Sequence, residues 1–454
     1  MSHREGNLEA PTRHAVDWKH ADYYDEDKCF HELERIFDIC HGCRRCVSLC
    51  HSFPTLFDLV DGGKSGEVDG VDRQDYWKVV DQCYLCDLCY MTKCPYVPPH
   101  QWNLDFPHAM LRAKAIKFRK GEVKASERFL ASTDVHGQFA GIPVVVQAVN
   151  AVNRTAFARK AMESHLGVDS KAWMPELAGH RFRWSAKKSG SQDVKEGERT
   201  PGKVAIFATC YVNYNEPGIG HDLLKILEHN AIPYVLVEKE KCCGMPKLEL
   251  GDLESVERHK DANIPVLAKY AKDGFAIVSA VPSCTLMFKQ ELPLLFPQDE
   301  DVRLVREAMW DPFEYLVARH RDGLLKTDFS QALGRVSYHV PCHGRVQNIG
   351  RKTEEMLKLI GQHVTVSLNT VERCSGHAGT YGVKKPYHDI AMKIGKPVFK
   401  AMGRGGAEGA GPDVISSDCA LAGHHIAQGM AENGLPAAAL QHPLTLVRRA
   451  YGLS

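Results

Sequence analysis

Two short, cysteine-rich runs near the start of the chain constrain its fold more than any other feature. The first run, DICHGCRRCVSLCH, holds Cys40, Cys43, Cys46 and Cys50, with two, two and three residues between successive cysteines. The second run, CYLCDLCYMTKCPY, holds Cys83, Cys86, Cys89 and Cys94, and Pro95 follows directly. Thiols packed this densely along a chain are cross-linked to one another or bind metal.

Metal ligation is the better explanation for these thiols. The chain has 454 residues, enough for several domains with cores of their own, and its N-terminus lacks the apolar stretch of a secretory signal. Large domains in a reducing compartment rarely depend on disulfides. No stretch approaches the roughly 18 uncharged residues of a membrane helix. We therefore expect a cytoplasmic protein without a transmembrane helix.

The net charge of the chain excludes one broad class of partner. It is +1 at neutral pH. A chain so close to neutrality creates no global field that would draw it onto nucleic acid or an anionic membrane. We therefore expect no nucleic-acid partner.

The spacing of the two runs is that of a ferredoxin-type module with two [4Fe–4S] clusters. In that arrangement three thiolates of one run bind one cube, and the fourth cysteine binds the other cube. The first cluster is therefore predicted on Cys40, Cys43, Cys46 and Cys94, and the second on Cys83, Cys86, Cys89 and Cys50. His51 replaces the proline usual after the first run, and four residues precede Cys94 instead of three, yet neither departure removes a ligand. Zinc ribbons or knuckles are the alternative, although zinc prefers separate CxxC or Cys/His pairs.

The sequence around the runs predicts helices and gives the first domain boundaries. HELERIFDI and DFPHAMLRAKAIKFRKGE have helical periodicity. We expect a disordered or extended arm over 1–28, an α-helical ferredoxin module over 29–125 and a helical connector and linker over 126–200. Within the connector, GIPVVVQAVNAVNRTAFARKAMESHLG has an apolar start and a basic end, so it packs on a core, on a partner or on a membrane surface. Core or partner packing is the preferred interpretation.

The second half of the chain is an internal duplication that the cysteines reveal. Thirty-one residues separate Cys210 from Cys242, and thirty-one separate Cys342 from Cys374. Cys284 and Cys419 follow in the two copies, and equivalent cysteines lie 132, 132 and 135 residues apart. Self-similarity at a fixed period indicates a repeated structural unit.

Each repeat has the pattern of an α/β domain with a parallel sheet. Short β-rich runs such as VAIFATC and VSYHVPC lead into the cysteines, and helical segments such as GHDLLKILEHN and TEEMLKLIG lie between the runs. Alternating strands and helices imply a parallel sheet with right-handed crossovers, whose ligands gather at the carboxyl ends of the strands. The predicted fold is therefore a multidomain α/β protein in which two repeated α/β cysteine-rich domains, over 201–330 and 331–454, follow the ferredoxin-type module.

The two repeats differ in how many thiols they offer. The first offers Cys210, Cys242, Cys243 and Cys284, enough for a third cluster or a zinc ion. The second offers Cys342, Cys374 and Cys419, because Ser375 stands where the first repeat has Cys243. The second site is then empty, recruits a histidine, or holds a cluster with one iron open to substrate. The candidate histidines are His339, His343, His377, His424 and His425.

These motifs resemble a known family. KCCGMPKLELGD and ERCSGHAGTYGVKK, with PSCTLMFKQELP and SDCALAGHH downstream, look like the two cysteine-rich CCG domains of the heterodisulfide reductase-related iron-sulfur family. The whole layout is similar to that of the C subunit of anaerobic glycerol-3-phosphate dehydrogenase, and more loosely to glycolate oxidase and lactate-utilisation iron-sulfur subunits. Met287 and Ala422 stand where full CCG domains carry the second cysteine of a CxxC, which argues against heterodisulfide chemistry.

The resemblance implies an iron-sulfur electron-transfer subunit of an anaerobic-type oxidoreductase. Such a subunit passes electrons between a flavoprotein dehydrogenase and a quinone or other redox partner, in the cytoplasm or peripherally on the inner face of the cytoplasmic membrane. No dinucleotide or P-loop motif is found in the chain, so a flavin or nicotinamide would be bound by a partner. Arg44 and Arg45 would stabilise the reduced first cluster by Coulomb attraction or would form an exposed basic surface.

Two other function classes stay open. The first is a self-contained reductase of a disulfide, persulfide or peroxide-linked partner at the CCG site, including electron supply to a rubrerythrin-like protein. The second is a zinc-stabilised or redox-sensing interaction module. No general acid or base can be named from the sequence, so catalytic residues are unknown and the chain is expected to be an oxidoreductase subunit and not a stand-alone catalyst.

Overall fold

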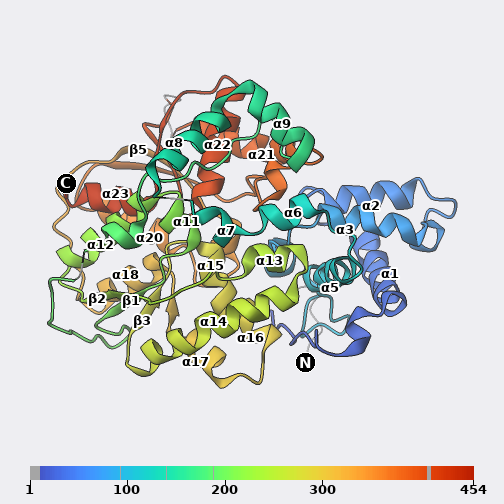
Figure 1. Cartoon of the computed structure of the whole chain (residues 1–454), viewed down its shortest axis with the longest axis horizontal. Helices are drawn as coiled ribbons and strands as arrows, with labels where there is room; N and C mark the ends of the chain where they lie inside the picture. Colours follow the sequence, from blue (N-terminus) through green and yellow to red (C-terminus); the bar gives the residue numbers. More distant parts are fainter. Residues whose placement is uncertain (1–10, 93, 140, 188, 406–410) are drawn as a thin grey trace.

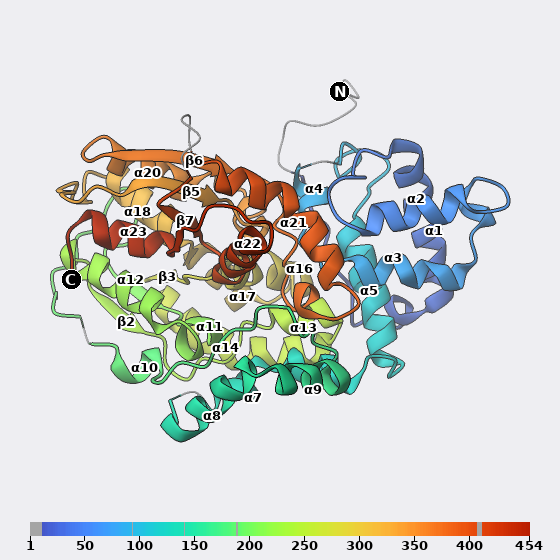
Figure 2. The same cartoon turned by 90° about the horizontal axis from the view of Figure 1, so that it is seen from above.

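A helical lobe and a larger α/β lobe make up the molecule (Figure 1, Figure 2). The computed structural model describes residues 11–454 except 93, 140, 188 and 406–410. The α/β lobe contains two separate parallel sheets, as the sequence predicts. In the described part of the chain, no helix has the length and apolar character needed to cross a membrane.

The helical lobe contains both cysteine runs. Its helices are α1 (Glu26–Cys43), α2 (Ser52–Asp61), α3 (Tyr76–Gln82), α4 (Leu88–Thr92) and α5 (Phe106–Arg119). Asp25 and Asp105 cap α1 and α5 by accepting hydrogen bonds from backbone N–H groups of the first turn. Phe53 packs on Phe106 with ring centroids 4.7 Å apart, and Leu33 is fully buried. The helices expected on either side of the runs are present.

The segment before α1 joins the helical lobe to the α/β lobe. The Arg13 guanidinium lies 2.7 Å from Asp87, 2.9 Å from Asp105 and 3.3 Å from Glu291, and all three pairs are largely buried. The Trp18 indole N–H donates to the Leu295 carbonyl at 3.1 Å, in α16 (Leu292–Leu295). Residues 13–18 therefore connect two parts of the chain that lie far apart in sequence.

The first sheet holds β1 (Val204–Ile206), β2 (Tyr234–Leu236), β3 (Ala276–Val278) and β4 (Met309–Trp310), in the order β2-β1-β3-β4. All its strand pairs are parallel. Its helices are α11 (Cys210–Tyr214), α12 (Pro217–His229), α13 (Met245–Leu250), α14 (Leu253–Lys272), α15 (Pro282–Leu286), α16, α17 (Glu300–Ala308) and α18 (Pro312–Arg321). Every residue of the central strands β1 and β3 is buried and apolar, because both faces of the sheet are covered there.

The second sheet repeats the topology of the first. It holds β5 (Gly334–His339), β6 (Val366–Val371), β7 (Val414–Ser417) and β8 (Ala439–Leu440), in the order β6-β5-β7-β8 with parallel pairs. Its helices are α19 (Cys342–Arg345), α20 (Lys352–Gly361), α21 (His388–Gly403), α22 (Ala420–Glu432) and α23 (Pro443–Ala450). The same strand order in both units fits the duplication that the cysteine spacing predicts.

The connector is helical and lies on the outside of the α/β lobe (Figure 1, Figure 2). It contains α6 (Ala125–Leu130), α7 (Thr133–Gly137), α8 (Pro143–Arg154), α9 (Ala156–Leu166) and α10 (Phe182–Ser185). Most of its large apolar side chains are not in a core: Val144 is 78 % exposed and Phe157 is 86 % exposed. The core-packing interpretation of this segment is therefore wrong for these residues, and contact with a partner or a membrane surface remains.

Candidate metal centres

The structure brings together the four cysteines predicted to bind the first cluster. Cys40, Cys43, Cys46 and Cys94 line one small cavity, with Ile39, Phe53, Tyr96 and Leu104 among the residues around it. Burial raises the pKa of Cys40 well above its usual range, and the three neighbouring thiols raise it further. Cys40 and Cys43 lie in the last turn of α1, and Arg44 follows in the left-handed conformation with φ 49°.

The structure also gathers the second predicted set, Cys50, Cys83, Cys86 and Cys89. Burial raises the pKa of Cys89, and the thiols of the other three members add to the shift. Burial likewise raises the pKa of Cys83 to about 11. Leu85 and Asp87 adopt positive φ values of 52° and 60°, so the backbone turns sharply between successive cysteines. The four thiols of this set therefore lie near one another, and their assignment to one cluster stays a prediction.

The cysteines of the first α/β unit come from three strand ends. Cys210 begins α11 after β1, Cys242 and Cys243 follow β2, and Cys284 lies in α15 after β3. Hydrogen bonds from Cys210 and Cys243 lower the pKa of Cys242, and the bond to Cys242 raises the pKa of each of those two thiols. The sulfur atoms of Cys210, Cys242 and Cys243 therefore lie within hydrogen-bonding reach of one another. A metal or cluster bound here would displace their protons.

Three further residues at this first site were missed from the sequence. The side chains of Thr133 and His259 lie beside the Cys242 sulfur and help to lower its pKa. The Asp134 carboxylate accepts a hydrogen bond from the Cys242 backbone N–H at 3.2 Å. Thr133 and Asp134 belong to α7 of the connector, so this helix covers the site. No local signal marks them, because their contact depends on how the connector crosses the sheet edge.

The second α/β unit places its three cysteines at the equivalent positions. Cys342 begins α19 after β5, Cys374 follows β6, and Cys419 caps α22 after β7. Burial and then the neighbouring thiols raise the pKa of Cys342, and burial raises the pKa of Cys419 to about 11. Ser375 is buried at the position of Cys243 and offers no thiol. This site therefore gathers three sulfur ligands.

The glycine after the middle cysteine keeps the same conformation in both units. Gly244 has φ 98° and Gly376 has φ 86°, a region that side chains rarely adopt. A Cβ atom at Gly376 would collide with the Ala391 carbonyl oxygen. The Gly376 N–H donates to the Cys374 sulfur at 3.3 Å. The glycine therefore lets the backbone approach the sulfur closely.

The five candidate histidines divide into two groups. The ring nitrogens of His339 are engaged by the Ser417 hydroxyl at 3.1 Å and the Arg373 carbonyl at 2.9 Å. His424 stacks on Trp173 and lies 2.7 Å from the Glu216 carboxylate. Among the described residues, nothing pairs with the buried Nε2 atoms of the other three, which are His343, His377 and His425. If a histidine is the fourth ligand of the second CCG site, the candidates are therefore these three side chains.

The second run lies directly against the second α/β site. Burial raises the pKa of Cys86, and the next largest contributions come from Cys342 and Cys374. The Tyr84 hydroxyl lies 3.2 Å from the Cys374 sulfur. Two groups of thiols from opposite ends of the chain are thus adjacent, an arrangement that sequence spacing does not reveal.

The residues present fit iron-sulfur clusters in number and surroundings. Each run-derived set supplies four sulfurs, and a cubane cluster takes four thiolates. The cavity around the first set has a volume of about 290 Å³ and mainly apolar neighbours. In the described part of the chain, no three His, Cys, Asp or Glu side chains are arranged to hold a single metal ion.

Arg44 and Arg45 have different environments. Arg44 pairs with Asp61 at 2.9 Å and is partly exposed, so its charge is neutralised at the surface. Arg45 lines the cavity of the first cysteine set. Arg45 is also exposed to solvent, so its Coulomb contribution to the first cluster stays a prediction.

Comparisons with known proteins agree with this architecture. Residues 204–289 and 336–426 match the family model of the cysteine-rich domain CCG, so the chain carries two copies of this domain. The chain is 26 % identical over 328 residues to the C subunit of anaerobic glycerol-3-phosphate dehydrogenase of Escherichia coli K12, covering 71 % of this chain and 76 % of that protein. It is 28 % identical over 185 residues to lactate utilization protein A of Bacillus pumilus, covering 40 % of this chain and 75 % of that protein.

A third relative is longer than the region it shares with this chain. The chain is 25 % identical over 256 residues to the B subunit of fumarate reductase (CoM/CoB) of Methanothermobacter marburgensis, covering 56 % of this chain and 48 % of that protein. The resemblance to CCG iron-sulfur proteins that the motifs carry is therefore confirmed.

Proposed function

We propose that this chain, with its two CCG cysteine-rich domains, is an iron-sulfur electron-transfer subunit of an oxidoreductase. It would hold two [4Fe–4S] clusters in the helical lobe and a further iron-sulfur cluster in the CCG domains; the described residues form no site for a single zinc ion. Its electrons would pass between a flavoprotein dehydrogenase and a quinone or other redox partner. Two relatives that are named as subunits of a dehydrogenase and of a reductase support this role.

The adjacency of the cysteine groups is the observation that carries the proposal. Cys46 of the first set contributes to the pKa shift of Cys89 in the second set, so these sets are neighbours. Cys86 of the second set neighbours Cys342 and Cys374. The series leads from the helical lobe into the second CCG domain. Such a series supports stepwise transfer of single electrons.

The protein's part in this function is to hold and tune the clusters. The first cluster would be held by Cys40, Cys43, Cys46 and Cys94, and the second by Cys83, Cys86, Cys89 and Cys50. When bound, each cube accepts and donates one electron. Hydrogen bonds to sulfur and burial set its potential. The Tyr84 hydroxyl and the Gly376 N–H act in this way on Cys374.

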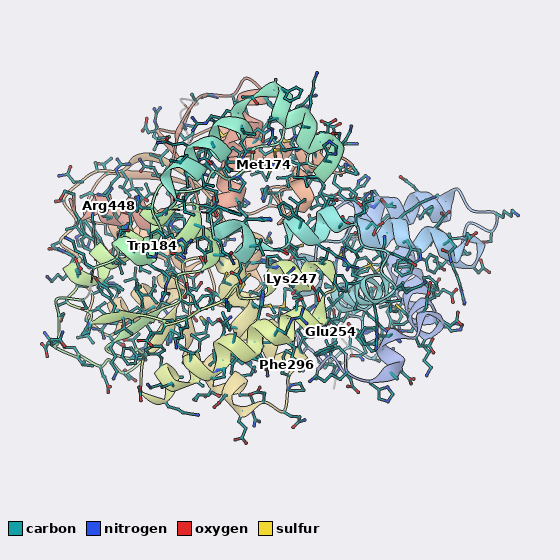
Figure 3. The ribbon with its side chains drawn as sticks, viewed as in Figure 1. Met174, Trp184, Lys247, Glu254, Phe296 and Arg448 are labelled. Atoms are coloured by element: carbon teal, nitrogen blue, oxygen red, sulfur yellow. The ribbon has the colours of Figure 1, made fainter. Side chains whose placement is uncertain are left out.

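The exposed connector supports docking on a partner or on the inner face of the cytoplasmic membrane. Val144, Val152 and Phe157 present apolar side chains to solvent, and Trp184 is 62 % exposed (Figure 3). Arg154 lies at the end of α8. Apolar side chains beside basic residues are typical of surfaces that rest on lipid. We place the protein in the cytoplasm, peripheral to this membrane.

The three-thiol site supports one alternative function. A cluster bound by Cys342, Cys374 and Cys419 would keep one coordination position for a substrate, because Ser375 supplies no sulfur. The chain would then reduce a disulfide, persulfide or peroxide-linked partner by itself. Substrate-dependent turnover by the isolated chain would distinguish this reductase from a relay.

Anaerobic purification with iron, sulfide and electron paramagnetic resonance analysis tests the main proposal. We predict that Cys94→Ala removes one of the two clusters of the helical lobe, because a ligand is lost. The matched control is Cys29→Ala, since Cys29 is a buried cysteine of the same lobe outside both sets. It should retain its iron. A colourless wild-type protein, or unchanged iron in Cys94→Ala, would refute the assignment.

A further inference from the structure

A cavity lies where the helical lobe meets both CCG domains. Its empty space is about 600 Å³, a figure that includes the open mouth and the solvent in front of it. The lining comes from the second cysteine run (Cys83, Tyr84), from α5 (Lys114, Lys117), from α13 (Glu249, Leu250) and from the segment of the second domain that includes Tyr381, Lys384 and Tyr387. One wall therefore carries a predicted ligand of the second cluster.

Two charged side chains of this cavity have no paired counter-ion. Lys117 pairs with Asp81 at 2.7 Å, and Lys384 pairs with Glu127 at 2.7 Å. Among the described residues, no hydrogen bond or ion pair is formed by the side chain of either Lys114 or Glu249. Both residues are partly buried. A lysine and a carboxyl group left unpaired in one cavity are suited to a ligand that exchanges protons.

Glu249 lies between the two CCG domains. Its carboxylate contacts Gly379 of the second domain. Burial raises the pKa of Glu249 to about 7, so the group holds a proton in a substantial fraction of molecules near neutral pH. A carboxyl group that is protonated near neutral pH can donate a proton to a bound ligand.

A row of tyrosines leads from the second CCG site to this cavity. Tyr84, whose hydroxyl reaches the Cys374 sulfur, packs on Tyr381 with centroids 5.0 Å apart. Tyr381 stacks on Tyr387 with centroids 4.7 Å apart and planes at 9°. These three tyrosines form an aromatic wall of the cavity, adjacent to two cysteine groups, in which the planes of Tyr84 and Tyr381 are tilted by 49°.

We propose that this cavity binds the ring of a quinone-type carrier, a flat molecule with two carbonyl oxygens that takes up two electrons and two protons. This inference rests on the proposed electron-transfer function and adds the site and the proton donors. The tyrosine wall contacts the ring face, Lys114 donates to one carbonyl oxygen, and Glu249 in its protonated form donates to the other.

The reaction balances with the groups named. The quinone receives two electrons, one at a time, from clusters that a flavoprotein dehydrogenase has reduced. One proton comes from the Lys114 ammonium and one from the Glu249 carboxyl, and both carbonyl oxygens become hydroxyls. Solvent returns the two protons through the open mouth of the cavity. No bond to carbon or sulfur forms.

Reoxidation of the pre-reduced whole chain under anaerobic conditions tests the proposal. Clusters are reduced with dithionite, the excess is removed, and recovery of the visible absorption is followed after mixing with an acceptor. Menadione tests a soluble ring, and a prenylated naphthoquinone in phosphatidylglycerol vesicles tests a lipid-borne ring. Ferricyanide takes an electron without a proton and reports on the clusters alone.

We expect Lys114→Met and Glu249→Gln each to slow reoxidation by quinone by about a hundredfold, the lower end for loss of a positioned proton donor. Reoxidation by ferricyanide should not change. Val123→Trp, which fills the cavity from its rim, should also block the quinone. The matched controls are Lys247→Met on the same helix α13 and Glu254→Gln on α14, which are labelled in Figure 3. Neither residue lines the cavity, so both variants should behave as wild type.

The outcomes separate this inference from the function on which it rests. If the Lys114 and Glu249 variants are reoxidised more slowly by both menadione and the quinone in vesicles, the cavity binds the quinone ring. If only reoxidation by the quinone in vesicles is slower, the cavity binds a lipid-borne carrier. Variants that keep the wild-type rate with quinone would overturn the inference. The inference would also be overturned if the wild-type protein reduced ferricyanide but neither of the two quinones. Its proposed function as an electron relay would still stand. A protein without clusters would overturn both.

Discussion

Replacing Arg13 with methionine tests whether the N-terminal segment holds the two lobes together by charge. Arg13 is 5 % exposed and contacts three carboxylates, Asp87, Asp105 and Glu291. Its loss leaves buried negative charge that, in the described part of the chain, is partly offset by the neighbouring His108. Removing one partner from a buried ion pair costs about 3 to 5 kcal/mol. That free energy corresponds to an increase of roughly two to four powers of ten in local opening.

Native-state hydrogen exchange followed by mass spectrometry, under anaerobic conditions, measures this opening in peptides covering residues 86–110. Arg13→Met should accelerate exchange there by the factor given above, provided that exchange remains limited by the opening equilibrium. Arg154→Met is the control, because its pair with Glu176 is exposed, and its exchange should match wild type. Adding Asp105→Asn to Arg13→Met should recover part of the loss. If the peptides of Arg13→Met exchanged at the wild-type rate, Arg13 would not stabilise the contact between the lobes through these three carboxylates, and the prediction would be wrong.

Two further predictions concern the backbone of the second CCG site and the pH dependence of the lobe contact. Gly376→Ala should remove the cluster or metal of that site, because the backbone has φ 86° and the Ala391 carbonyl oxygen occupies the place of a Cβ atom. The control is Gly350→Ala, which has φ 78° and no atom of the described residues closer than 3.7 Å to the new Cβ atom, and it should keep the iron content of wild type. Burial lowers the pKa of His108, but Asp105 and Glu291 outweigh it and raise the pKa to about 9. The stabilisation by His108 is therefore complete below its unfolded pKa of about 6.5 and is lost as pH rises through 9. His108→Gln should abolish this alkaline loss of stability in urea unfolding, and a loss that persists in the variant would contradict the assignment.

The sequence predicts what depends on spacing along the chain. The two cysteine runs, the helices beside them, the duplication and the parallel sheets all follow from local periodicity and repeated intervals. The contacts of Tyr84 with Cys374 and of Thr133 with Cys242 do not, because they depend on how separate units pack. In the connector, the helical periodicity of the sequence predicts helices but does not predict what their apolar faces contact. An apolar helical face looks the same in sequence whether it faces a core or, as Val144 does, solvent.

The second CCG domain, which has three thiols where the first has four, is the one that lies beside the second cysteine run. A four-thiol site can satisfy every iron of a cube, whereas a three-thiol site leaves one coordination position for another ligand. In this chain the three-thiol site is the one that Cys86 and Tyr84 approach from the helical lobe. Loss of the thiol at Ser375 therefore falls at the point where electrons would leave the helical lobe. If Ser375→Cys supplied a fourth thiolate, we would expect the iron content of this domain to rise, because the ligand set of a cube would then be complete.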